Sequence, residues 1–193
     1  VQFLLIIQRA NGGDNGMEMS SNGAGVGDQT NPTIANFTML SGTPTGANAF
    51  RINSGHIGRF INGVVVHDNG QPCIEWAGSA GNAVAGYQGG GVDPMFDSVL
   101  IDCNGGGLAE DDTAAAQDAI DMGANNDDAY SDTLVATFIN GSAEMAAVEF
   151  ATPLSTIDPW FEDTDYVGAV KDTSASSRWW AGWTCGLESG SDC

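Results

Sequence analysis

The carboxylates are the side chains of this sequence that are best suited to catalysis or metal binding. Asp97 and Asp102 lie five residues apart, and Asp68, which follows His67, is expected near Asp102. Glycoside hydrolysis needs two carboxyl groups close together beside the substrate. An odd separation along a regular strand sends two side chains to opposite faces, so Asp97 and Asp102 do not form such a pair. We therefore predict no catalytic residue and interpret these acids as corner and loop residues.

The two histidines give no stronger case for an enzyme. His56 lies in a glycine-rich loop and His67 at the end of an expected strand. Isolated histidines are more often surface residues than catalytic groups or metal ligands, and we place both at the surface. The sequence has no Gly-x-Ser-x-Gly element or phosphate-binding glycine loop in a suitable context.

Two acidic clusters offer oxygen ligands of the kind that calcium prefers. One is Asp111-Asp112, and the other is the loop of residues 125–128. Neither has the spacing of a dedicated calcium-binding loop. Asp111 or Asp112 also fits as the N-cap of a following helix. Calcium is the one candidate cofactor, and its candidate ligands are Asp111, Asp112, Asp127 and Asp128.

The four cysteines indicate disulfides and not a zinc site, because they form no Cys-x-x-Cys pair and no histidines cluster beside them. An even number of cysteines in an acidic chain rich in Gly, Asn and Ser is typical of an extracellular protein. Of three possible pairings we favour Cys73–Cys103, between neighbouring repeats, with Cys185–Cys193, which closes a short loop. Free buried thiols at Cys73 and Cys103 are the alternative.

The charge of the chain excludes two classes of partner. Five basic and 25 acidic side chains give a net charge of −20, and Lys171 is the only lysine. Such a surface repels nucleic-acid phosphates and anionic lipid, and no run of eighteen apolar residues predicts a membrane span. An acidic coat with little lysine suits a salty or calcium-containing medium. We expect an extracellular or cell-surface protein whose chain is a processed product or part of something longer.

Repeated apolar patterns show how these residues must be positioned. Three short segments, residues 16–19, 49–52 and 73–76, alternate between apolar and charged side chains. Their alignment places two apolar columns on one strand face and a charged column on the other: Met17/Phe50/Ile74, Met19/Ile52/Trp76 and Glu18/Arg51/Glu75. The apolar columns predict a dry interior, and the charged column predicts an alternating ladder on the outside.

A second set of repeats consists of longer segments: residues 1–6, 35–40, 61–66 and 96–101. Asn36, Asn62 and Asp97 share one column of this alignment, and Asn and Asp tolerate left-handed backbone. We predict corners of the chain at these residues and at Gln2. Beyond the corner both strand faces are apolar, so one face fills the interior. The other face needs a cover, either the C-terminal segment or another subunit.

The repeats predict a mainly β protein that folds as a right-handed parallel β-helix, a solenoid whose coils have three short sides. A β-sandwich of short strands is the alternative. Coils are expected over residues 1–108. Residues 109–193 are expected to add a helix ending near Met122, a strand over 133–139, a short strand or helix over 146–150, and a Trp-rich tail. We expect the whole chain to be one structural unit.

The tail contains four of the five tryptophans, between Trp160 and Trp183. Exposed tryptophans can stack on sugar rings, but burial of each ring at about 25 cal/mol per Å² favours an anchoring role. We therefore expect the tail to fold back over the coils. Residues assigned to packing or assembly lie in the first coil and in the tail: Val1, Phe3, Trp160, Phe161, Tyr166, Trp179, Trp180 and Trp183.

The tail also carries two motifs that suggest a relationship. They are Asp-Pro-x-Phe followed by Asp-Tyr-Val-Gly-Ala-Val, at residues 158–170, and Trp-x-Ala-Gly-Trp-Thr, at residues 179–184. After β-helical repeats, this combination resembles the C-terminal part of large secreted bacterial surface proteins of the pectate-lyase-like β-helix superfamily. The resemblance implies a fold and export from the cell. It implies no activity, because that group offers no catalytic residues to carry over.

The function we expect is that of a non-enzymatic extracellular structural protein. The first coil is expected to leave main-chain groups and apolar side chains open at Val1. Copies stacked end to end on that edge would build a filament. The alternative is a secreted protein that binds or degrades polysaccharide, which rests on analogy of fold.

Overall fold

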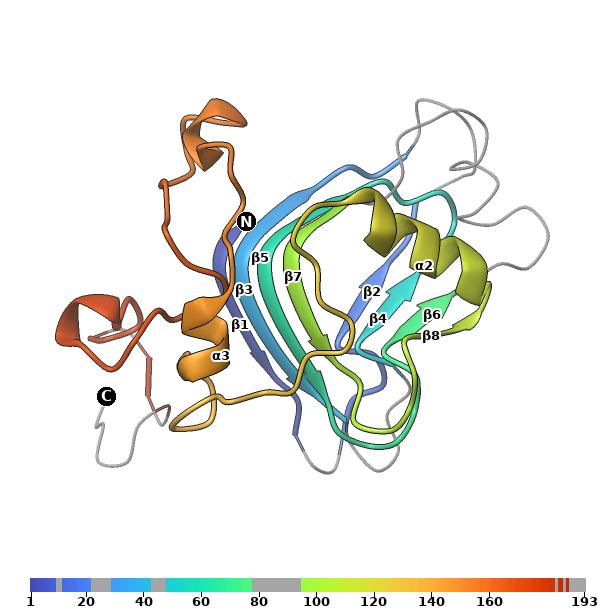
Figure 1. Ribbon diagram of the computed structural model, residues 1–193, viewed down its shortest axis with the longest axis horizontal. Coiled ribbons are helices and arrows are strands. Elements are labelled where there is room, and N and C mark those ends of the chain that lie inside the picture. The colour runs from blue at the N-terminus through green and yellow to red at the C-terminus, as the bar shows by residue number, and fades with distance from the viewer. Residues whose placement is uncertain are drawn as a thin grey trace.

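The computed structural model describes residues 1–9, 12–21, 29–42, 48–77, 95–182, 184–185 and 187. Within these ranges the protein is mainly β, and its strands form two four-stranded parallel sheets. The first sheet has the order β1 (Gln2–Ile7), β3 (Thr33–Ser41), β5 (Arg59–His67), β7 (Met95–Asp102). The second has the order β2 (Met17–Met19), β4 (Phe50–Ile52), β6 (Ile74–Trp76), β8 (Ala109–Asp111). The chain thus adds one strand to each sheet in turn (Figure 1).

The second sheet has the predicted register. Met17, Phe50 and Ile74 are aligned in successive strands, as are Met19, Ile52 and Trp76. These side chains are buried, whereas the charged column is not. The Arg51 guanidinium lies 3.6 Å from the Glu18 carboxylate and 3.1 Å from that of Glu75. The predicted outer charge ladder is therefore confirmed.

The first sheet differs from the predicted register by one residue in its two outer strands. Ala35 pairs with Ile61 as expected. However, Gln2 pairs with Ala35, in place of Val1, and Asp97 pairs with Ile61, in place of Phe96. These strands are apolar on both faces, so a slip of one residue leaves their hydrophobic pattern almost unchanged.

The corners follow the observed register. Four residues at one level of the first sheet have left-handed backbone, with φ of 56°, 47°, 53° and 56°: Phe3, Asn36, Asn62 and Ser98. The corners predicted at Asn36 and Asn62 are confirmed. Those predicted at Gln2 and Asp97 are wrong, because each corner lies one residue later. The position of each corner is set by its alignment with the corners of the neighbouring strands. This alignment outweighs the preference of Asn and Asp for left-handed backbone.

An apolar interior lies between the two sheets. Its centre is a group of aromatic rings, in which Phe60 stacks on Phe96 with centroids 4.9 Å apart and packs edge-on against Phe50 at 5.3 Å. Gly63 permits this packing, because a Cβ there would overlap the ring of Phe37. The rings come from successive strands, so the interior is continuous from layer to layer.

Helix α2 (Thr113–Met122) covers the end of this interior beside β7 and β8 (Figure 1). Asp112 caps the helix by accepting a 3.1 Å hydrogen bond from the Ala115 main-chain N–H, and Gly123 ends it. Its buried face joins the main core: Ala115, Ala116, Ala119 and Ile120. The helix, its cap and its apolar stripe are as predicted from the sequence.

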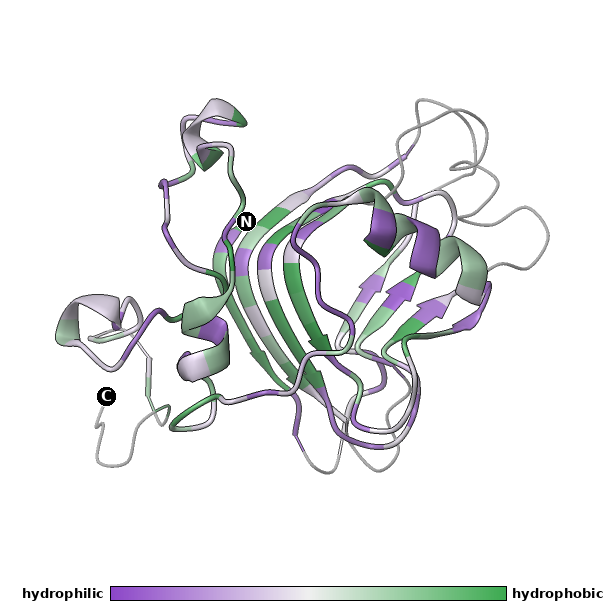
Figure 2. Cartoon of the chain, in the orientation of Figure 1, coloured by the Kyte–Doolittle hydropathy of each residue, from purple (hydrophilic) through white to green (hydrophobic). Residues whose placement is uncertain are grey.

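The C-terminal segment covers the outer face of the first sheet, at the left of Figure 1. It includes α3 (Ser142–Ala146) and two single turns, η1 (Leu154–Thr156) and η2 (Ala175–Ser177). Three apolar patches make the contact: Phe138, Ile139, Ala169, Val170 and Trp180 against Leu5 and Leu40; Leu154 and Phe161 against Ala35 and Ile61; Tyr130 and Val167 against Val64 and Leu100. Figure 2 shows the apolar strands that lie beneath this cover. The predicted cover is the chain's own tail.

Two details of the predicted layout differ. The described residues form two sheets, with no third side to the coils. The strand expected over residues 133–139 is a turn closed by a single bridge between Val135 and Ile139, and residues 146–150 contain only the end of α3. Among the described residues, no helix has the length and apolar character needed to span a bilayer.

Candidate functional site

The acids considered for catalysis hold the main chain in place. The Asp97 carboxylate accepts a 3.0 Å hydrogen bond from Ala124 N–H. Asp102 accepts hydrogen bonds from the main chain of Asn104 and Asp132, each at 3.0 Å, and Asp68 accepts one from the Asn104 side-chain amide at 2.5 Å. Asp68 and Asp102 thus meet at one loop, as expected. Both carboxylates are engaged in shaping it.

Three of the four candidate calcium ligands are also engaged in local structure. Asp112 caps α2. Asp127 accepts a hydrogen bond from Ala129 N–H, and Asp128 accepts one from the Gln117 side chain at 3.1 Å. Asp111, at the end of β8, is exposed. The described ranges bring no three His, Cys, Asp or Glu side chains together in a way that could hold a metal ion, so calcium stays a prediction.

Both histidines are buried, so their predicted surface location is wrong. His56 is 2% exposed and His67 is 1% exposed. His67 Nδ1 is hydrogen-bonded to the Ser41 hydroxyl at 2.7 Å across paired residues of β3 and β5. His56 Nδ1 is bonded to the Thr30 hydroxyl at 2.7 Å, and burial lowers the pKa of His56 to about 4. Each ring is a polar part of the packed interior and is held by a hydroxyl from the preceding layer.

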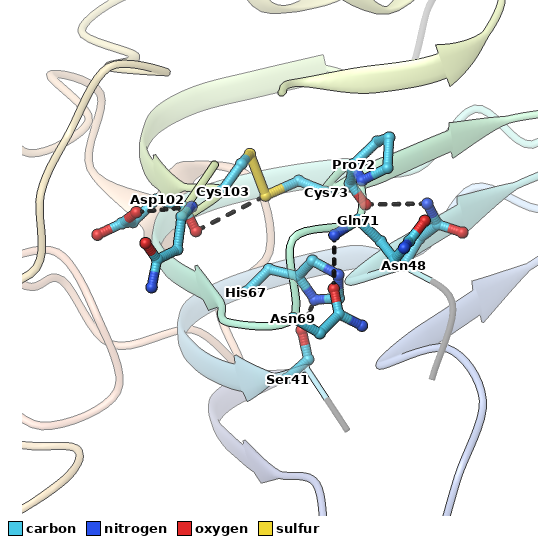
Figure 3. The surroundings of a disulfide bond; sticks show 10 residues. Ser41, Asn48, His67, Asn69, Gln71, Pro72, Cys73, Asp102 and Cys103 are labelled. Carbon is cyan, nitrogen blue, oxygen red and sulfur yellow. Dashed lines mark hydrogen bonds between the residues drawn. A yellow bond between two sulfur atoms is a disulfide. The ribbon is translucent and has the colours of Figure 1, made fainter. Parts of the chain in front are cut away.

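The disulfide Cys73–Cys103 is confirmed, with the two Cα atoms 5.4 Å apart (Figure 3). Cys73 directly precedes β6 and Cys103 directly follows β7, so the bond ties the two sheets together. Figure 3 shows the Ser41–His67 pair close to it. The predicted partner of Cys185, Cys193, lies outside the described residues, as does Trp183.

Polar side chains at or next to the corners fasten the C-terminal segment to the first sheet. The Asn62 side-chain oxygen accepts a 2.7 Å hydrogen bond from Phe150 N–H, and the Asn36 amide donates to the Tyr166 carbonyl at 3.0 Å. Gln2 exchanges two hydrogen bonds of 2.8 Å with the main chain of Glu162. The sequence predicted corners at all three of these polar residues, correctly for Asn36 and Asn62, but it did not predict that their side chains would reach the tail.

The aromatic residues assigned to packing fall into two groups. Phe161 and Trp180 are buried in the cover, and Tyr166 and Trp179 are half-buried. Trp160 is 68% exposed, so it anchors little. It lines a cavity of about 320 Å³ together with Val1, Thr33, Ile157, Asp158 and Phe161.

The two ends of the stacked sheets differ. At one end α2 closes the interior. At the other end β1 and β2 are edge strands, and no described residue pairs with their outer sides. Ile7 at this edge is 43% exposed, and Leu4, Leu5 and Ile6 are only partly buried. An edge of this kind offers unpaired main-chain groups to another strand. We take it as the candidate assembly site.

Comparisons with protein-family models, with curated proteins and with solved structures found no match. The resemblance seen in the tail motifs therefore stays an expectation. The geometry of this chain alone carries the functional argument.

Proposed function

We propose that this protein is a right-handed parallel β-helix that serves as a non-enzymatic structural element of an extracellular assembly. In this role α2 closes one end of the solenoid, and the β1–β2 end receives a further β-coil. The alternation of strands between two parallel sheets supports the helical path, and parallel crossovers are right-handed in about 98% of cases. The Cys73–Cys103 disulfide supports an oxidising compartment.

The single observation that carries this proposal is the asymmetry between the two ends. At the α2 end, Ala116 and Ala119 are at most 1% exposed, so the core is sealed. At the β1 end, Ile7 and the outer main-chain groups of the strand face outward. A solenoid whose coils contact only their neighbours is stabilised by the addition of a layer there.

The α2 cap also decides the form that self-association takes. Head-to-tail stacking into a filament needs both ends open, and α2 occupies one of them. Two copies therefore meet through like ends, β1 against β1. Such an isologous contact closes on itself and stops at a dimer. The proposed assembly is a closed pair, or a single solenoid that this chain terminates, and not an unlimited fibre.

Sedimentation of the purified protein tests the proposal with two matched variants. Ile7→Lys places a charge on the open edge, where charged side chains prevent pairing of edge strands. Met122→Lys makes the same change at an exposed apolar residue, 68% exposed, at the end of α2. We expect the wild type and Met122→Lys to form a concentration-dependent dimer, and Ile7→Lys to remain monomeric.

The contrary outcomes are distinct. A wild type that stays monomeric at every concentration contradicts a receptive edge. Dimers that Ile7→Lys does not weaken place the contact elsewhere. Fibres that both substitutions disrupt would show head-to-tail stacking and an α2 that moves aside.

The non-enzymatic part of the proposal has a separate test. The carboxylates of Asp97 and Asp102 accept main-chain hydrogen bonds. Incubation with acidic polysaccharides and calcium is expected to yield neither unsaturated products, seen by ultraviolet absorbance, nor new reducing ends. Either product would show an enzyme.

A further inference from the structure

A second cavity, of about 370 Å³, lies where the first corner of the chain meets the tail. This volume is near the lower end of the range for small-molecule pockets, about 300–1,000 Å³. Its lining combines three aromatic rings with one ammonium, one carboxylate and two serine hydroxyl groups: Phe3, Tyr166, Trp179, Lys171, Glu162, Ser176 and Ser177.

Hydrogen bonds hold three residues of the cavity wall in place before any ligand arrives. The Trp179 indole N–H donates to the Ala169 carbonyl at 2.9 Å, which sets the orientation of the ring. Glu162 is held by its two main-chain bonds to Gln2. Ser177 donates to Asp172 at 2.8 Å. Preorganised walls lower the cost of ordering side chains on binding.

The charges around the cavity restrict the ligand. Lys171 lies 2.6 Å from the Asp165 carboxylate and 5.7 Å from the centre of the Tyr166 ring. The place where a cationic ligand would sit on that ring is therefore taken by Lys171 itself. An anionic ligand would be repelled by the Glu162 carboxylate, and the Lys171 ammonium, already paired with Asp165, would offset this only in part. A neutral ligand with many hydroxyl groups avoids both repulsions.

We propose that this cavity binds a neutral pyranose sugar. The apolar C–H face of the ring would lie on Trp179, and its hydroxyl groups would bond Lys171, Glu162 and the two serines. The half-buried aromatic rings supply the area, and the charged and hydroxyl groups supply orientation. The proposal goes beyond the structural role and does not depend on it, since it uses tail residues and only Phe3 from the coils.

Isothermal titration of the full chain with methyl glucoside, methyl galactoside and methyl mannoside tests the proposal. Glucuronate and choline serve as the anionic and cationic probes. We expect saturable millimolar binding of at least one neutral glycoside and none of the charged probes. Binding of choline or glucuronate in its place, or no saturable heat with any neutral glycoside, overturns the proposal.

Three variants locate the site. Trp179→Ala is expected to weaken binding by about tenfold, as loss of an aromatic contact at a binding hot spot does. Lys171→Gln, at a partly exposed side chain, is expected to weaken it severalfold while the fold, followed by circular dichroism, is kept. If Trp179→Ala does not fold, Lys171→Gln still tests the proposal. The matched control Trp160→Ala, in the other cavity, should leave affinity unchanged. Weakening by Trp160→Ala alone would contradict the assignment.

Discussion

The Tyr130 hydroxyl donates a hydrogen bond to the Glu144 carboxylate, and this pair fastens the beginning of the C-terminal cover. Glu144 is only 1% exposed. It also accepts hydrogen bonds from Thr133 N–H at 2.8 Å, from the Thr133 hydroxyl at 2.7 Å and from Gly141 N–H at 2.7 Å. One buried carboxylate thus joins the turn before α3 to the start of that helix.

We predict that Glu144→Ala destabilises the protein by about 3 kcal/mol, because several buried donors lose their acceptor at once. Glu144→Gln should cost less, since one acceptor oxygen remains. The free energy of unfolding in urea measures both. Asp118→Asn, at an exposed site on α2, is the control and should change stability by less than about 0.5 kcal/mol. A loss for Glu144→Ala no larger than that of the control would contradict the role given to the carboxylate.

Substitutions at two corner residues can distinguish the effect of backbone strain on stability from that of side-chain hydrogen bonding. Asn62 and Ser98 have φ of 53° and 56°, and the Ser98 hydroxyl has no partner among the described residues, whereas Asn62 binds Phe150. Glycine relieves the left-handed strain at either site. We expect Ser98→Gly to be neutral or slightly stabilising, and Asn62→Gly to be less stable than it by about 1–2 kcal/mol. Thermal unfolding measures the difference, and equal effects would show that the Asn62 bond contributes nothing.

Because His56 is buried, we expect the stability of the fold to fall in acid. Its folded pKa of about 4 lies below the value of 6.5 for an unperturbed histidine, so the unfolded chain binds more protons between these values. The contribution of His56 is complete above pH 6.5 and is lost as pH falls toward 4, by about 3 kcal/mol in all. His56→Gln, which does not titrate, should lose less stability than the wild type between pH 7 and 4. Parallel pH profiles from urea unfolding would refute this.

The Cys73–Cys103 bond should stabilise the protein mainly by restricting the unfolded chain. The two cysteines are 30 residues apart, which corresponds to about 3–4 kcal/mol in the chain-entropy view. We expect Cys73→Ser with Cys103→Ser to lower the unfolding free energy by that amount under non-reducing conditions. A reducing agent should reproduce most of this loss in the wild type and have a much smaller effect on the double variant, which keeps the predicted Cys185–Cys193 pair. Unchanged stability in both cases would show that the bond does not form.

The sequence predicted some strand pairs well and others one residue out of place, for a physical reason. In the segments of β2, β4 and β6 a charged residue separates two apolar ones, so only one alignment keeps the charges outside. In β1 and β7 both faces are apolar, and neighbouring alignments look alike. The corners at Phe3 and Ser98 could be found only once the strands were paired, because neither Phe nor Ser has a marked preference for left-handed backbone.

Other features of the structure divide in the same way into those that the sequence could predict and those that it could not. The helix cap at Asp112, the stripe on α2 and the Cys73–Cys103 pair could be predicted because they depend on near neighbours or on adjacent repeats. The burial of His56 and His67, and the meeting of Phe3 with Tyr166 and Trp179, could not.

The sequence by itself determined the parallel repeats, the capped helix and an aromatic tail that had to leave water, since each is written in local spacing and hydrophobicity. Only the tertiary structure decided which end of the stack is closed, where the tail lies and which polar groups are buried. The position of the tail, for example, depends on contacts between residues more than a hundred positions apart, such as the Gln2 side chain with the main chain of Glu162. Their contact follows from how layers stack, and short-range sequence patterns carry no record of it.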